Sequence, residues 1–193
     1  MLNFYSFFIY IFITTFTPGP NNIMSMSNAV RFGIKKSFPF CIGAFVSVSV
    51  IMLMSAVFSS TLFNYIPKVR IYMLAAGASY MLYLAWKIFK SGSEIKQNEN
   101  SNASFLSGML FQFVNPKLYI YAITVMSTYV IPAYDSGLIL AGFSFLLAFV
   151  CFTSTVAWAL FGAVFCKLLH KHSMIVNSIM SLLLVYCAVT LFL

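Results

Sequence analysis

Charged residues are scarce in this chain. Only 7% of its 193 residues are Asp, Glu, Lys or Arg, and three of these are acidic, whereas a soluble domain carries roughly 25% charged residues. So few charges cannot cover an aqueous surface, which excludes an ordinary soluble domain. Hydrophobic residues make up 62% of the sequence, and its mean hydropathy is +0.96. The composition therefore predicts an integral membrane protein that has lipid as a partner.

Clusters of metal-ligating or redox residues are also missing. The chain has four cysteines that form no CxxC pair: Cys41, Cys151, Cys166 and Cys187. We interpret them as small packing residues, with a redox role as the alternative. His170 and His172 lie beside Lys167 and Lys171 without a nearby carboxylate, which favours a solvated basic loop over a metal pair. We therefore expect no metal, no cofactor and no catalytic residue, since a membrane enzyme needs such a cluster.

The first 17 residues are apolar but lack the basic segment that opens a cleavable signal peptide. We expect them to stay in the protein as the start of a first membrane span. The net charge of +8 comes from Lys and Arg spread over several short stretches. Because these residues do not form one basic face, we expect no nucleic-acid partner.

Apolar runs account for most of the sequence. Six are separated by short polar or turn-forming stretches at about 31–36, 64–70, 91–102, 132–137 and 167–173. The apolar runs are approximately 2–30, 38–63, 69–90, 104–129, 137–165 and 173–192. A bilayer core about 30 Å thick takes roughly 20 residues of helix. The sequence therefore predicts an all-α, polytopic membrane protein of six transmembrane helices, as a single domain over 1–193.

The distribution of Lys and Arg predicts the orientation of these spans. The odd-numbered connections, with the ends of the spans beside them, hold eight of these residues and the even-numbered ones hold two. Since cytoplasmic loops retain Lys and Arg, we expect the odd connections inside and both termini outside. Six spans also divide into two halves, about 1–96 and 97–193, that enter the membrane in opposite directions, as in an inverted repeat.

The first span of each half is interrupted at a corresponding place. The interruptions are Pro18-Gly19-Pro20-Asn21-Asn22 and Asn115-Pro116-Lys117. Pro18 should end or kink one helix and Pro20 suits the first position of the next, while Asn115 should cap a helix that begins at Pro116. The N-terminus of a helix attracts anions, and paired breaks of this kind point to a transporter site for a substrate carboxylate. The alternative is that the prolines only shape packing.

Polar side chains follow both interruptions at helical spacing. One stripe comprises Thr14, Thr17, Asn21, Ser25 and Asn28, and the other Lys117, Tyr121, Thr124 and Thr128. The Ser and Thr members are interpreted as helix-to-helix contacts. Lys117 is the only charged residue well inside a predicted span, where it costs about 2.5 to 3.5 kcal/mol. A substrate carboxylate would compensate this cost. The alternatives are that the side chain snorkels to the membrane interface or bonds to freed backbone carbonyls.

The same motifs carry a family resemblance. Thr17 to Asn22, Gly33, Gly43, the Leu84-Ala85-Trp86-Lys87 segment and Asn115-Pro116-Lys117 together resemble the LysE/RhtB amino-acid exporters over essentially the whole chain. Gln112 to Asn115 and the segment 183–189 are most similar to the cysteine and O-acetylserine exporters. Asn21 stands where exporters of cationic amino acids often carry an acidic residue, so a basic substrate is less expected.

The resemblance implies a non-enzymatic secondary transporter in the bacterial inner membrane. It would export small neutral amino acids by proton antiport and alternating access, although no intramembrane carboxylate or histidine is present to carry the proton. Export of threonine or homoserine, a channel or an assembly subunit stay as alternatives, and a homo-oligomer stays open. The expected substrate-binding residues are Pro18, Gly19, Pro20, Asn21, Asn22, Asn115, Pro116, Lys117 and Tyr121.

Overall fold

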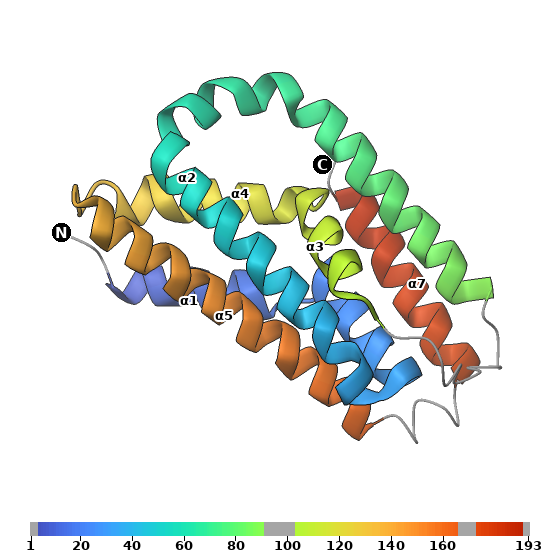
Figure 1. The fold of residues 1–193 in the computed structure, drawn as a ribbon. Helices are drawn as coiled ribbons and strands as arrows, with labels where there is room; N and C mark the ends of the chain where they lie inside the picture. Colours follow the sequence, from blue (N-terminus) through green and yellow to red (C-terminus); the bar gives the residue numbers. More distant parts are fainter. Residues whose placement is uncertain (1–3, 91–102, 166–172, 191–193) are drawn as a thin grey trace.

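The computed structural model describes residues 4–90, 103–165 and 173–190, and all regular secondary structure within these residues is helical (Figure 1). The all-α prediction is therefore confirmed. The predicted loops at 91–102 and 167–173, with His170 and His172, lie outside the described residues, apart from Ser173 at the start of α7. The helices are α1 (Phe4–Phe16), α2 (Pro20–Lys90), α3 (Phe105–Phe113), α4 (Pro116–Val125), the π-helix η1 (Met126–Val130), α5 (Gly137–Val164) and α7 (Ser173–Thr190).

Helix α2 departs from the sequence prediction. The connections expected at 31–36 and 64–70 are wrong as loops, because the backbone stays helical through both. The chain changes direction within the helix instead, at Gly33 with its φ of 75° and along the arch at the top of Figure 1. Glycine adopts a positive φ without steric cost, so the chain can turn at Gly33 with helix on both sides.

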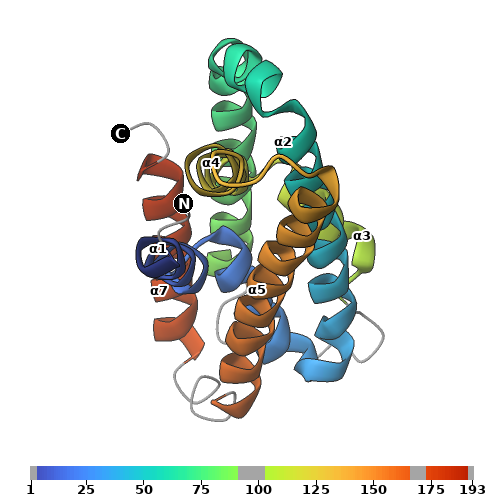
Figure 2. The same cartoon turned by 90° about the vertical axis from the view of Figure 1, so that its left-hand side faces the viewer.

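Both predicted helix breaks are confirmed. Helix α1 ends at Phe16 and α2 begins at Pro20, while α3 ends at Phe113 and α4 begins at Pro116. In each case proline occupies the start of the new helix, where its missing amide costs nothing. Helices α1 and α4 are both seen end-on in Figure 2, with α2, α5 and α7 running past them.

A close crossing joins α2 to α3. A Cβ atom on Gly43 would overlap the carbonyl oxygen of Phe105, and one on Gly108 would overlap the carbonyl oxygen of Phe40. Ser47 Oγ also donates to the carbonyl of Met109 across the crossing, at 3.0 Å. Small residues allow membrane helices to approach this closely. The crossing fixes α3, and thereby the point at which α4 begins.

The outer faces of the helices are apolar. Phe8 and Phe12 of α1 are 59% and 63% exposed, and Phe149 of α5 is 54% exposed. Among the described residues, two helical stretches are long and apolar enough to cross a membrane, Pro20–Val57 and Gly137–Val164, and α1 is a shorter apolar helix. Apolar side chains facing outward suit a hydrocarbon environment.

Candidate functional site

The first break is held together by side chains that bind the carbonyl end of α1. Asn22 Nδ2 donates to the carbonyls of Thr15 at 2.8 Å and Thr17 at 3.1 Å. From α5, Ser154 Oγ donates to the Thr15 carbonyl at 2.8 Å and Trp158 Nε1 to the Phe16 carbonyl at 3.3 Å. The last carbonyls of a helix have no partner in the helix itself, and in a membrane protein they must find one elsewhere. These contacts supply it.

The second break is a capped helix start. Asn115 Oδ1 accepts from the Lys117 amide at 3.2 Å, and the Leu118 amide donates to the Asn115 carbonyl at 3.1 Å. The Asn115 Nδ2 group donates to Gln112 Oε1 at 3.0 Å. The predicted cap is thus confirmed. Pro116 has no amide proton, and the amides of Lys117 and Leu118 are bonded to Asn115. The first amides of α4 therefore already have partners within the chain.

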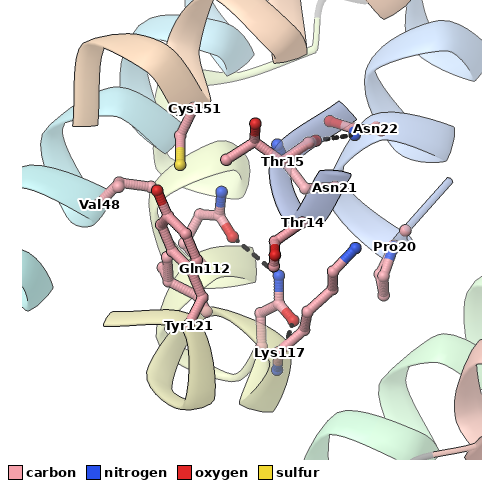
Figure 3. A pocket seen from close by; sticks show the side chains of 13 residues that line it. Thr14, Thr15, Pro20, Asn21, Asn22, Val48, Gln112, Lys117, Tyr121 and Cys151 are labelled. Atoms are coloured by element: carbon pink, nitrogen blue, oxygen red, sulfur yellow. Dashed lines mark hydrogen bonds between the residues drawn. The ribbon is translucent and has the colours of Figure 1, made fainter. Parts of the chain in front are cut away.

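The two breaks meet at one cavity of about 60 Å³. The Lys117 ammonium from α4 donates to Thr17 Oγ1 at 3.3 Å, and its Nζ would lie 2.9 Å from a Cβ on Gly19. Figure 3 shows the Lys117 side chain extending toward Pro20. Among the described lining residues only Lys117 is formally charged. With the positive N-terminal end of α2 beside it, this part of the cavity favours an anion.

Asn21 presents an unpaired oxygen at the cavity. Its Nδ2 donates to Thr155 Oγ1 at 2.7 Å, and the Thr155 hydroxyl donates in turn to the Cys151 carbonyl at 2.9 Å. Since the Thr155 proton is already used, Asn21 must turn its amide nitrogen toward Thr155. Asn21 Oδ1 is buried without a hydrogen-bond partner, although a buried acceptor normally has one. A ligand with an N–H group would supply that donor.

Tyr121 presents a second unpaired group. The residue is 3% exposed, and its hydroxyl is buried without a hydrogen-bond partner. Its ring is stacked against Tyr10, with the centroids 6.1 Å apart and the planes at 17°. In Figure 3 the hydroxyl points toward Val48 and Cys151. This end of the cavity therefore has a phenolic hydroxyl in a fixed position, directed toward Val48 and Cys151.

Most of the predicted site residues gather at this cavity. The lining includes Gly19, Pro20, Asn21, Asn22, Asn115, Lys117 and Tyr121, whereas Pro18 is exposed and Pro116 is buried, and neither lines it. The remaining lining residues are Thr14, Thr15, Val48, Gln112, Leu118 and Cys151. Of these, Thr14 was marked by its polar stripe. Cys151 carried no sequence signal beyond a cysteine in an apolar run.

The polar stripe after the first break also contains a helix-to-helix contact, as expected for its serine and threonine members. Ser25 Oγ donates to the Thr155 carbonyl of α5 at 2.9 Å. The described residues contain no group of three or more His, Cys, Asp or Glu side chains placed to hold a metal ion. Asp135, between η1 and α5, is the only acidic residue that the described part of the chain contains.

Comparison with known proteins places this chain in a family. The LysE type translocator family matches residues 12–193. Cysteine/O-acetylserine efflux proteins of Escherichia coli strain K12 and of Shigella flexneri serotype 5b are each 36% identical to the chain over 188 residues. The match covers 97% of this chain and 96% of each relative. No solved structure matches the chain. Because the family match spans nearly the whole sequence, this chain belongs to the LysE type translocator family.

Proposed function

We propose that this protein exports small neutral amino acids, such as cysteine or O-acetylserine, across the bacterial inner membrane. Family membership over residues 12–193 supports this proposal, and so do the relatives named as cysteine/O-acetylserine efflux proteins. The relatives and this chain have nearly the same length, since the match covers 97% of one and 96% of the other. No catalytic residue or cofactor enters the proposal.

The observation that carries the proposal is the position of Lys117. Its ammonium reaches from the start of α4 to Thr17 in the other break, 100 residues away in sequence, at 3.3 Å. A cation inside a membrane is costly, and a substrate carboxylate at this point would offset that cost. The same substrate would place its ammonium against Asn21 Oδ1, the buried acceptor that has no partner. The two groups together match the two charged ends of a zwitterionic amino acid.

The other predicted site residues hold this arrangement in place. Asn22 binds the carbonyl end of α1, Asn115 caps α4, and Gly19 leaves room for the Lys117 ammonium. Pro20 and Pro116 start the two helices. The first amides of α2, at Asn21 and Asn22, have no carbonyl partner within their own helix and can add to carboxylate binding. Pro18 contributes by ending α1.

The membrane arrangement is part of the proposal. Six spans in two inverted halves, with both termini outside, agree with the distribution of Lys and Arg in the sequence. The substrate would be released by alternating access at the cavity between the two breaks. Proton antiport is the coupling that the family resemblance implies. The described lining contains no carboxylate or histidine, so the proton carrier is not assigned to a residue.

Transport by the purified protein in lipid vesicles tests the function. Cysteine, O-acetylserine, threonine and lysine are compared with and without an imposed pH gradient. We expect efflux of the small neutral amino acids, little transport of lysine, and acceleration by a proton gradient directed against substrate flow. Threonine as the preferred substrate would support the alternative exporter assignment. No carrier-mediated flux of any amino acid would contradict the proposal.

The site is tested by substituting Lys117. A hydrogen bond to a charged group contributes about 1.5–3 kcal/mol, so Lys117→Ala should weaken substrate binding by about 10- to 150-fold. Insertion into the membrane should not suffer, because the variant removes a charge from the hydrocarbon region. Lys117→Arg should retain part of the binding. Lys90→Ala is the matched control, since the Lys90 ammonium lies over the Trp86 ring at 5.0 Å and does not line the cavity. Wild-type binding in Lys117→Ala would make Lys117 purely structural.

A further inference from the structure

The cavity has two chemically different ends. Figure 3 shows the Lys117 ammonium directed toward Pro20, while the Tyr121 hydroxyl is directed toward Val48 and Cys151. The first end carries the positive charge of Lys117, and Asn21, whose amide is bonded to Thr155 of α5, lines the same cavity. The second is formed by uncharged side chains. A zwitterionic amino acid whose carboxylate is held by Lys117 at the first end would therefore extend toward the second.

From this geometry we infer that Tyr121 and Cys151 form a side-chain subsite that selects short amino acids carrying an oxygen or sulfur atom. The inference rests on the proposed function. It adds that the second end of the cavity contacts the side chain of the substrate. Val48 and Leu118 are apolar and also line the cavity. Tyr121 is the specificity-determining residue, and Cys151 sets the length of the side chain that fits.

The Tyr121 hydroxyl supplies the first argument. It is a buried polar atom without a partner, and leaving such a group unsatisfied costs about 1–3 kcal/mol. A ligand atom that accepts from this hydroxyl, or donates to it, removes this penalty, whereas a methyl group in the same position does not. Sites of this kind reject the analogue that lacks the polar atom far more strongly than they reject a change in size.

The fixed position of the Tyr121 ring supplies the second argument. Stacking on Tyr10 and a 3% exposed side chain leave the ring little freedom to turn its hydroxyl elsewhere. Tyr121 also belongs to a hydrophobic cluster with Leu118, Ala122 and Val125 of the same helix. Because the ring cannot swing out, its hydroxyl stays directed toward the Cys151 end of the cavity. A preorganised polar atom of this kind favours selectivity.

Cys151 supplies the third argument. It comes from α5, lines the cavity, and in Figure 3 its thiol lies at the end toward which the Tyr121 hydroxyl points. A thiol is small and polarizable and acts only as a weak hydrogen-bond donor. It therefore limits the length of the side chain without adding charge. Cationic or acidic side chains would be buried there without an ionic partner, which is costly.

Vesicle transport of two isosteric amino acids tests the inference. L-cysteine, kept reduced, and L-2-aminobutyrate differ only in a thiol in place of a methyl group. The wild-type protein should prefer cysteine, and Tyr121→Phe should lower the ratio of the two rates by about fivefold, the equivalent of one hydrogen bond of about 1 kcal/mol. The 2-aminobutyrate rate should stay the same or rise. Tyr119→Phe is the matched control, two residues away on α4 and outside the lining.

An unchanged ratio in Tyr121→Phe would overturn the inference, and so would an equal loss of both substrates. Absence of transport in the wild-type protein would instead overturn the proposed function, and the subsite with it.

Cys151→Ala provides a test that does not depend on the tyrosine variant. A smaller residue lengthens the subsite, so transport of O-acetylserine should rise relative to cysteine by several-fold. Cys41→Ala is the control, since Cys41 is buried beside Ser25, with the two side-chain atoms 3.5 Å apart, and does not line the cavity. The same substrate ratio in Cys151→Ala and the wild type would remove Cys151 from the subsite.

Discussion

Adding one methyl group at Gly43 or Gly108 should force α2 and α3 apart. The new Cβ would overlap a backbone carbonyl oxygen, that of Phe105 for Gly43 and that of Phe40 for Gly108. A backbone carbonyl within a helix cannot rotate away as a side chain can. The whole helix must therefore shift, and with it the end of α3 that leads into the second break.

The expected magnitude follows from two opposing effects. Replacing a helical glycine with alanine favours the helix by about 1 kcal/mol, whereas inserting a methyl group into a closely packed contact costs typically about 1–3 kcal/mol, sometimes more. With backbone as the obstacle we expect the upper part of that range, and a net loss of about 1–2 kcal/mol. For a chain of this size, each kcal/mol corresponds to roughly 2–4 °C in the unfolding midpoint.

Thermal unfolding in detergent measures this effect. Gly43→Ala and Gly108→Ala should each lower the midpoint by about 2–8 °C. Gly142→Ala in α5 is the matched control, because nothing lies within 4 Å of a Cβ there, so its midpoint should rise slightly. The double variant should lose less than the sum of the two single losses, since helices already separated by one methyl group accommodate the second.

Two results would refute this reasoning. One is a midpoint in Gly108→Ala equal to or above that of Gly142→Ala, which would mean that the crossing is not close. The other is strict additivity in the double variant, which would mean that the two glycines do not share one contact.

Two further predictions concern the breaks themselves. Gly19→Ala would bring a Cβ to 2.9 Å from Lys117 Nζ, so the flexible ammonium should shift and the substrate concentration for half-maximal transport should rise several-fold with an unchanged unfolding midpoint; an unaltered concentration would contradict this. Asn115→Ala should remove a helix cap that contributes about 1 kcal/mol and lower the midpoint by roughly 2–4 °C, whereas Asn115→Asp keeps the Oδ1 acceptor and should retain more stability. Equal losses in the two Asn115 variants would argue against the cap.

The helix breaks were predictable because local chemistry decides them. Pro20 and Pro116 cannot continue a helix from the preceding turn, and Asn115 caps whatever helix follows it. Lys117 stood out for an equally local reason, as a charge within an apolar run. The loops predicted at 31–36 and 64–70 were wrong, because the prediction took polar composition as a sign of a loop. The chain turns there with helix continuing on both sides, and within 31–36 it does so through the positive φ of Gly33.

The remaining part of the site depends on contacts between distant segments. Nothing local in Cys151, Ser154 or Trp158 distinguishes them from other residues of an apolar helix, yet α5 brings them to the cavity and to the end of α1. From the sequence, Asn22 is only a polar residue at the start of a helix. The structure shows that its side chain binds a carbonyl of the preceding helix. Contacts between distant segments leave no periodic pattern or fixed spacing in the sequence, so they could not be predicted from it.

The hydrogen bonds at the end of α1 also differ in whether a substrate could replace them. Ser154 and Trp158 of α5 hold the last carbonyls of α1, and Asn21 joins α2 to α5 through Thr155. Breaking these contacts would strand carbonyls where no water can replace the lost donor. The bond from Lys117 to Thr17 is different, because a substrate carboxylate can take over the ammonium. The Lys117–Thr17 contact is therefore the one between the two breaks that a substrate can replace, whereas the bonds from α5 to the end of α1 have no such substitute.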